Sequence, residues 1–323
     1  MEIPLQANIE LPLEIPACLK VRAQGVGLYR TEYLFLNRNS LPSEDEQFQS
    51  YAQAAKAFAP LPVTLRTIDI GGDKFVEHLQ FSREENPQLG WRAVRFCLAR
   101  PDIFKTQLRA MLRASAHGRI EIMFPMISSM DELRAVKAIL QEVRADLDAD
   151  GIPYDPAIRV GTMIEVPSAI VLADWLAAEC DFFSIGTNDL IQYTLAVDRV
   201  NEKIAHLYEP AHPAILRMIR QAAEAAARAG IPCRLCGEMA GDPLYTDLLL
   251  GLGVTGLSMA AVAIHLIRAE ISLARLDEAR KLADEACQQR TAGEVKTLLR
   301  KRWTAKNAIR NYLEEIASKE FHD

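Results

Sequence analysis

Eight short apolar runs recur along the chain, and each one ends in or next to a polar or reactive group. Such runs, rich in β-branched and aromatic residues, are typical of strands, and amphipathic helical patterns lie between them. Strands that alternate with helices form a parallel sheet with right-handed crossovers. A doubly wound open sheet would give similar local patterns, but the number of units favours closure, and we predict a (β/α)8 TIM barrel over residues 1–273. The predicted strands are Leu5–Glu10, Gly25–Arg30, Pro62–Asp69, Ile120–Met126, Arg159–Val166, Asp181–Thr187, Pro232–Glu238 and Gly256–Met259.

Two of the predicted helices have clear starting signals. Ser43 with Glu46, and Ser129 with Glu132, fit the pattern of a capping box, in which the serine and the glutamate satisfy each other's backbone N–H groups. The helices that follow these signals are predicted at Gln47–Phe58 and Leu133–Leu147. Residues 274–323 are rich in Ala, Glu, Lys, Arg and Leu without a strand pattern, so we predict that they form extra C-terminal helices.

The composition is that of a large cytosolic globular protein. Half of the 323 residues are apolar and 25% are charged, which suits a sizeable core. The net charge of -6 argues against general nucleic-acid binding. We expect no membrane segment, because no apolar stretch approaches the roughly 20 residues that a spanning helix needs. The six scattered cysteines are expected to be reduced thiols in the cytoplasm.

Positively charged side chains gather at or near the predicted strand ends. Arg30 and Arg66 close two adjacent strands, and Lys74, Arg92 and Arg199 are further candidates. A single arginine at a strand end is more often part of a surface salt bridge. Two on neighbouring strands face a common mouth, and guanidinium groups bind phosphate and carboxylate oxygens in pairs. We therefore predict an anionic ligand that carries one or both of these groups.

Two carboxylates follow neighbouring strands in apolar surroundings. Glu165 lies at the end of the fifth predicted strand and Asp189 follows the sixth. Buried carboxylates need arginines or a metal ion to balance them, so an internal salt-bridge network is one interpretation. Beside an anionic ligand, hard oxygen donors favour Mg²⁺ or Mn²⁺.

Cys233 and Cys236 form a C-x-x-C pattern, but we do not interpret it as a redox pair. Residues three apart in a strand point to opposite faces, whereas thioredoxin-type cysteines lie at the start of a helix. Cys236 has the same parity as Arg234 and Glu238, so we predict that it faces the barrel interior at the mouth and that Cys233 packs against the helices.

Five segments together resemble the C-terminal domain of phosphoenolpyruvate-protein phosphotransferase, Enzyme I of the bacterial phosphotransferase system. The resemblance extends from about residue 7 to residue 268. Its last two segments also recur in pyruvate phosphate dikinase and phosphoenolpyruvate synthase. The segments are Gly25–Glu32 (GVGLYRTE), Arg66–Lys74 (RTIDIGGDK), Glu85–Arg92 (ENPQLGWR), Phe183–Asp189 (FSIGTND) and Cys236–Met239 (CGEM).

The resemblance implies a phosphoenolpyruvate-binding, Mg²⁺-dependent domain and a role for each candidate residue. Cys236 would be the general acid that protonates the enolate of pyruvate. Glu165 and Asp189 would bind Mg²⁺ (or Mn²⁺). The side chains that would hold the phosphate and carboxylate of the substrate are Arg30, Arg66, Lys74, Arg92, Asn188, Asp189 and Arg199.

The chain also departs from the family pattern. The family's phosphoryl-accepting histidine lies on a separate N-terminal domain in a Gly-Gly-x-Thr-Ser-His motif, and this sequence lacks the motif. Ile191 and Val200 replace a threonine and a glycine that are usual in relatives. We therefore expect a domain without its phosphohistidine and carrier-binding domains.

The resemblance implies further partners through the missing domains. These are the phosphocarrier protein HPr or its nitrogen-branch relative, and a second copy in a homodimer, in a pathway of sugar uptake or its nitrogen-related branch. Two other functions stay open. One is a stand-alone Mg²⁺-dependent barrel lyase that acts on pyruvate-like acids; the other is a non-catalytic phosphoenolpyruvate sensor, in which Cys236→Ala would leave function intact.

Overall fold

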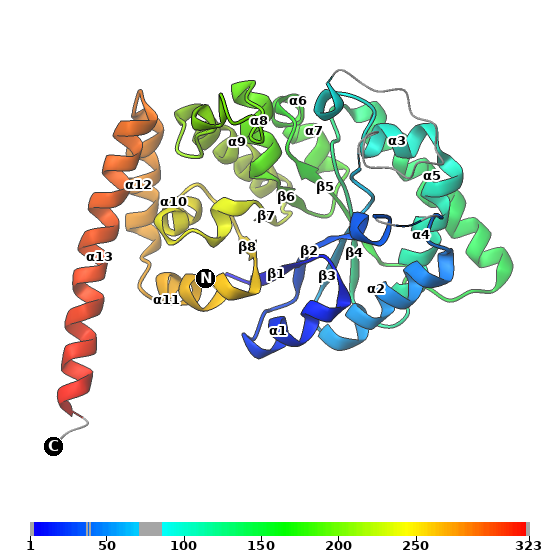
Figure 1. Cartoon of the computed structure of the whole chain (residues 1–323), viewed down its shortest axis with the longest axis horizontal. Helices are drawn as coiled ribbons and strands as arrows, with labels where there is room; N and C mark the ends of the chain where they lie inside the picture. Colours follow the sequence, from blue (N-terminus) through cyan, green and yellow to red (C-terminus); the bar gives the residue numbers. More distant parts are fainter. Residues whose placement is uncertain (1–2, 37, 39, 71–85, 321–323) are drawn as a thin grey trace.

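A closed barrel of eight parallel strands forms the centre of the molecule (Figure 1). The structure is a computed structural model that describes residues 3–36, 38, 40–70 and 86–320. Neighbouring strands pair in chain order, and β1 pairs with β8, which excludes the open sheet and confirms the predicted TIM barrel. The strands are β1 Leu5–Ile9, β2 Val26–Arg30, β3 Val63–Arg66, β4 Ile120–Phe124, β5 Arg159–Ile164, β6 Phe183–Ile185, β7 Cys233–Leu235 and β8 Gly256–Met259.

Several strands end earlier than the sequence predicts. β3 was expected to reach Asp69 but ends at Arg66, and β7 ends at Leu235, before Cys236. Single backbone hydrogen bonds continue past these ends, from Thr67 N to Met123 O (2.9 Å) and from Cys236 N to Ile185 O (3.1 Å). Polar residues beyond these ends, such as Asp69 and Cys236, therefore lie on backbone that leaves the regular ladder.

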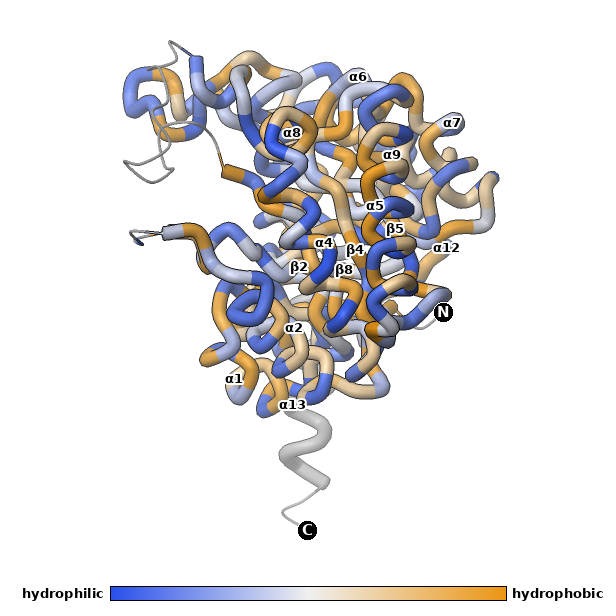
Figure 2. The backbone as a smooth tube through the Cα atoms, turned by 90° about the vertical axis from the view of Figure 1, so that its right-hand side faces the viewer, coloured by the Kyte–Doolittle hydropathy of each residue, from blue (hydrophilic) through white to orange (hydrophobic). Residues whose placement is uncertain are grey.

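Helices surround the barrel, and hydrophilic and hydrophobic residues alternate along them (Figure 2). The predicted C-terminal helices are present as α12 and α13; α13 runs beside α12 and extends past the barrel (Figure 1). Within the described residues, no helix is long and apolar enough to cross a bilayer. The helices are α1 Ile15–Lys20, α2 Glu44–Phe58, α3 Val94–Ala99, α4 Pro101–Ser115, α5 Met130–Asp150, α6 Pro167–Val171, α7 Ala173–Ala178, α8 Thr187–Leu195, α9 Pro213–Ala229, α10 Thr246–Gly251, α11 Ile264–Ser272, α12 Leu276–Gln288 and α13 Ala292–Glu320.

One of the two predicted capping boxes is complete. At the start of α2, the Ser43 side chain accepts from the backbone N–H of Glu46, and the Glu46 carboxylate accepts from that of Ser43. At the start of α5, Ser129 caps the helix as predicted. The Glu132 carboxylate accepts instead from the backbone N–H and the hydroxyl of Ser128, at 2.6 and 2.8 Å. This second box was wrong because the preceding serine offers the carboxylate two donors.

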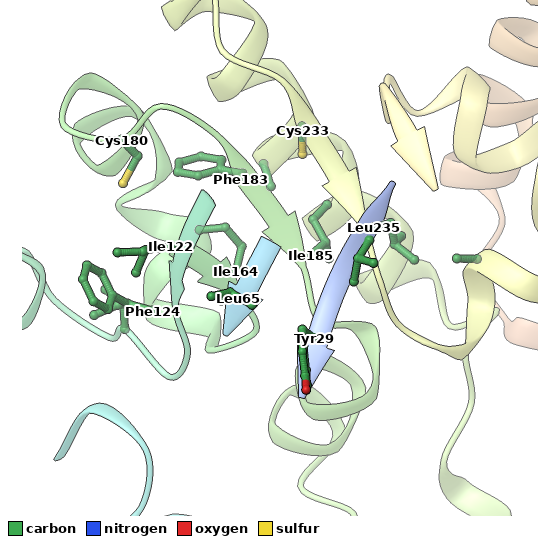
Figure 3. Packing of buried hydrophobic residues seen from close by; sticks show 14 of the residues in the cluster. Tyr29, Leu65, Ile122, Phe124, Ile164, Cys180, Phe183, Ile185, Cys233 and Leu235 are labelled. Carbon is green, nitrogen blue, oxygen red and sulfur yellow. The ribbon is translucent and has the colours of Figure 1, made fainter. Parts of the chain in front are cut away.

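Alternation along the strands separates an outer core from a small inner cluster. Figure 3 shows outward-facing strand residues packed together, among them Leu65, Ile122, Ile164 and Cys233. The inner cluster, as we call it below, is made of Leu28, Met123, Met163, Phe182 and Cys236. The two cysteines therefore belong to different cores, which agrees with the predicted opposite faces.

Buried ion pairs close the floor of the barrel and fix its last helix. Arg234 on β7 donates to the Glu121 carboxylate on β4 across the barrel, below the inner cluster. On the outside, Lys306 of α13 is buried, with its Nζ 2.7 Å from Asp247 of α10 and 3.3 Å from Glu270 of α11. A buried ammonium group needs such partners, so this pairing fixes the first half of α13 against the barrel.

Candidate active site

A cavity of about 410 Å³ opens at the C-terminal ends of the strands, and the predicted site residues line it together. The structure therefore brings together candidates from five different strand ends or the segments that follow them. Lys74 lies outside the described residues. The lining includes Arg30, Arg66, Arg92, Glu165, Asn188, Asp189, Arg199 and Cys236.

Two buried arginines form the cationic side of the cavity and share one carboxylate. Arg66 contacts Asp69 Oδ2 through Nη1 at 2.9 Å and donates to Glu32 through Nη2. Arg92 reaches Asp69 with both Nε and Nη2, at 3.1 and 2.8 Å. Its Nη1 lies 3.1 Å from the Tyr193 hydroxyl. Asp69 thus sets the spacing of the two guanidinium groups.

The protonation states of the acidic partners follow from these contacts. Although burial opposes ionisation of Asp69, the adjacent Arg92 and Arg66 lower the pKa of its carboxyl group. Burial raises the pKa of Glu32, and the nearby Asp69 charge adds to this effect although Arg66 opposes it. The ionised form is therefore favoured for Asp69, which pairs with both arginines, and disfavoured for Glu32.

Glu165 and Asp189 form the acidic side of the cavity. Glu165 is buried just beyond β5, and its Oε1 accepts the backbone N–H of Met126 at 2.7 Å. Burial, followed by the charges of Asp189 and Asp69, raises the pKa of Glu165 to about 8. A carboxyl group with this pKa is largely protonated at neutral pH unless a cation replaces the proton.

Asp189 carries an oxygen that lacks a hydrogen-bond donor. Its Oδ1 is buried, and none of the described residues donates a hydrogen bond to it. Arg92 Nη1 lies 3.7 Å from this oxygen, beyond hydrogen-bonding distance. The absence of a side chain at Gly186 leaves room for the Glu165 carboxyl group, since a Cβ there would lie only 2.7 Å from Glu165 Oε2. An unsatisfied carboxylate oxygen beside a second carboxylate suits a hard divalent cation, and this fits the predicted Mg²⁺.

Cys236 lines the cavity and belongs to the inner cluster. Its Sγ donates to the backbone oxygen of Ile185 at 3.6 Å, and Asn8 Nδ2 donates to its carbonyl oxygen at 3.0 Å. Burial raises the pKa of the thiol, partly offset by the hydroxyl of Ser184. The thiol is therefore protonated at neutral pH and can donate a proton.

The remaining predicted residues lie at the rim of the cavity. Arg30 pairs with Glu10 at 2.9 Å and is only partly buried. Asn188 Nδ2 donates to Glu238 Oε1 at 3.0 Å, and Asn188 Oδ1 accepts the N–H of Glu238 at 3.1 Å. Arg199 is exposed on the loop that follows α8. All three side chains are at least partly exposed to solvent where they line the cavity.

Four contributors to the site were missed. Glu32 and Asp69 lie inside the segments on which the resemblance rests, so the sequence showed that carboxylates stand there. Their shared contacts with Arg66 depend on how the segments after the strands fold back. Ser184 is buried, and its hydroxyl has no partner that satisfies hydrogen-bond geometry among the described residues. Tyr193 is contributed by α8, where helical spacing alone does not distinguish it from a packing residue.

Comparisons with known proteins agree with the resemblance found in the sequence. The family described as PEP-utilising enzyme, PEP-binding domain, matches residues 1–276. The chain is 48% identical over 301 residues to phosphoenolpyruvate-protein phosphotransferase of Geobacillus stearothermophilus, covering 93% of this chain and 52% of the relative. For the same-named protein of Priestia megaterium, identity is 50% over 269 residues, with 83% and 47% covered. The chain thus spans about half the length of the curated relatives it matches.

Solved structures share the fold at low sequence identity. A citrate lyase from Burkholderia xenovorans aligns with a TM-score of 0.52 and 13% identity, covering 94% of this chain and 92% of that one. A malate synthase from Haloferax volcanii aligns with a TM-score of 0.52 and 12% identity, covering 84% and 72%. At this identity the likeness shows the barrel fold alone.

Proposed function

The chain belongs to the PEP-utilising enzyme family, as a PEP-binding domain, and we propose that its cavity binds phosphoenolpyruvate together with Mg²⁺ or Mn²⁺. In this proposal, the chain supplies the substrate site of a cytoplasmic phosphoenolpyruvate-protein phosphotransferase. A histidine on another domain accepts the phosphoryl group and passes it to HPr or to a nitrogen-branch carrier, and the barrel forms a homodimer. The identity of 48% to relatives twice as long supports this division of labour.

The observation that carries the proposal is the set of charges buried around one cavity. Arg66 and Arg92 face four carboxyl groups, those of Glu32, Asp69, Glu165 and Asp189. If all are ionised, the buried groups sum to two negative charges, which would repel a substrate with a phosphate and a carboxylate. A divalent cation removes this excess, so cation and substrate are expected to bind together.

The residues divide into those that hold the anion and those that hold the cation. Arg66 and Arg92, held by Asp69, offer guanidinium N–H groups to phosphate and carboxylate oxygens. At the rim of the cavity, Arg30, Asn188 and Arg199 would add further contacts to the ligand. Lys74, which lies outside the described residues, would add a further cation. Glu165 and Asp189 would bind the Mg²⁺ ion, which neutralises charge on the substrate oxygens when it is present.

Cys236 is placed to complete the reaction. The bond between phosphorus and the enol oxygen breaks as a nitrogen–phosphorus bond forms on the histidine, and the electron pair stays on the enolate. The Cys236 thiol then gives its proton to the methylene carbon, which leaves pyruvate and a thiolate that water protonates. Burial keeps the thiol protonated until that moment.

Two measurements test the proposal. Titration calorimetry of the chain with phosphoenolpyruvate should show binding that requires Mg²⁺. In D₂O with Mg²⁺, the chain should catalyse exchange of the methyl protons of pyruvate, and Cys236→Ala should abolish exchange while binding is kept. Cys18→Ala is the control, because Cys18 is also buried but does not line the cavity.

Complementation distinguishes the alternatives. With a separately expressed phosphohistidine domain, HPr and labelled phosphoenolpyruvate, label should reach the carrier. Tight binding without transfer or exchange would favour a sensor. Cleavage of a keto acid by the chain alone would favour a lyase, and absence of Mg²⁺-dependent binding would refute the proposed ligand.

A further inference from the structure

Two apolar side chains of the inner cluster also line the cavity. Leu28 on β2 and Met163 on β5 are both buried, pack in one cluster with Cys236, and share the cavity wall with it. Met123 and Phe182 belong to the same cluster, but they do not line the cavity. The polar cavity therefore has a small apolar recess next to the thiol.

The position of the thiol determines which part of a ligand enters this recess. In the proposed function, on which this inference rests, the carbon that receives the proton must approach Cys236 Sγ. That carbon is the methylene group at C3, the one apolar part of phosphoenolpyruvate. Its other neighbours must then be the side chains that surround the thiol. We infer that Leu28 and Met163 determine substrate specificity by confining C3 and excluding enolpyruvates that carry a substituent there.

The contacts of Met163 make this wall rigid. Its Sδ and Cγ would lie 2.9 and 3.1 Å from a Cβ at Gly186, so the side chain fills the space above that glycine. On another side, Arg66 Nη1 lies 3.9 Å from Sδ. Arg66 is itself fixed by Asp69, so Met163 has little room to move away from a larger substrate.

The test compares phosphoenolpyruvate with its E and Z 3-methyl analogues. Dissociation constants are measured by calorimetry with Mg²⁺ for the wild-type chain, Leu28→Ala, Met163→Ala and Met123→Ala. Met123→Ala is a matched control, because it removes an equally buried methionine from the same cluster without changing the cavity wall. Thermal unfolding of each variant reports whether it is folded.

The ratio of analogue to phosphoenolpyruvate affinity is the informative quantity. A pocket that discriminates by one methyl group achieves roughly 10- to 200-fold selectivity. Leu28→Ala or Met163→Ala should reduce the preference against at least one isomer by about tenfold, and Met123→Ala should leave it unchanged. An unchanged ratio in both wall variants, or an equal change in Met123→Ala, would overturn the inference while phosphoenolpyruvate binding still supports the proposed function. If the wild-type chain does not bind phosphoenolpyruvate, the proposed function itself fails.

Discussion

Glu165 should couple the binding of a divalent cation to the release of a proton. In the metal-free site, burial and the neighbouring Asp189 and Asp69 charges raise the pKa of Glu165 to about 8. With this pKa, the group is ionised in only about one molecule in ten at pH 7, and in about one in a hundred at pH 6. A cation binds the ionised form, so its apparent affinity should rise about tenfold between pH 6 and pH 7 and level off above pH 8.

Calorimetry measures this coupling directly. Mn²⁺ or Mg²⁺ is titrated into the chain at pH 7 in two buffers with different heats of ionisation, and the difference in apparent enthalpy gives the protons released. We expect about 0.9 protons per ion at pH 7 and close to none at pH 9. Because neighbouring carboxyl groups titrate together, the count belongs to the cluster around Glu165.

Two variants make the result specific. Glu165→Gln should lose the proton release and most of the affinity for the ion, whereas Glu142→Gln, which changes an exposed carboxylate on α5, should behave like the wild type. An affinity that is independent of pH between 6 and 8, or a proton count near zero at pH 7, would refute the reasoning. It would mean that Glu165 is already ionised in the empty site.

Three further predictions concern the supports of the site and the last helix. Asp69→Asn removes the charge that spaces two buried arginines, and should weaken phosphoenolpyruvate binding by roughly 2 kcal/mol, or about thirtyfold, in calorimetry; wild-type affinity would contradict this role. Gly237→Ala places a Cβ 1.8 Å from Thr187 Oγ1 and should lower the free energy of unfolding by about 1–3 kcal/mol in urea titration. Gly151→Ala is the comparison, because its positive φ strains the backbone while its Cβ meets no neighbouring atom. Lys306→Met removes the buried ammonium group that pairs with Asp247 and Glu270, and should cost about 3 kcal/mol by the same assay; a loss under 1 kcal/mol would show that water replaces the ammonium group.

The sequence predicted the fold well because the signal for each barrel strand lies within a short stretch of the chain. Every predicted strand begins within two residues of an observed one, since the apolar run that starts each strand is visible without knowledge of its neighbours. The ends were predicted less well, and those of β3 and β7 were placed too late. A strand ends where the neighbouring strand no longer offers a backbone hydrogen-bond partner. This depends on how the strands pair in the sheet, which a single stretch of sequence does not show.

The site shows the same division between local and long-range information. Arg66, Glu165 and Cys236 were found because residues at strand ends share one face of a barrel. The role of Asp69 was missed, because a carboxylate three residues after an arginine has no assigned partner until Arg92, 23 residues later, folds back to it. Contacts between a strand end and a distant loop are not encoded in any short pattern.

The distribution of charge, more than any single residue, explains why this site should need two ligands at once. Asp69 neutralises one of the two buried guanidinium charges and orients both groups, so a bound anion meets preformed N–H donors but little net positive charge. Glu165 and Asp189 remain on the opposite side, where burial, reinforced by the charges of Asp189 and Asp69, raises the pKa of Glu165 so that it holds a proton at neutral pH. A divalent ion that displaces this proton changes the field felt by the substrate, and the substrate in turn supplies oxygens to the ion. Each ligand should therefore raise the affinity for the other by the same factor, as thermodynamic linkage requires.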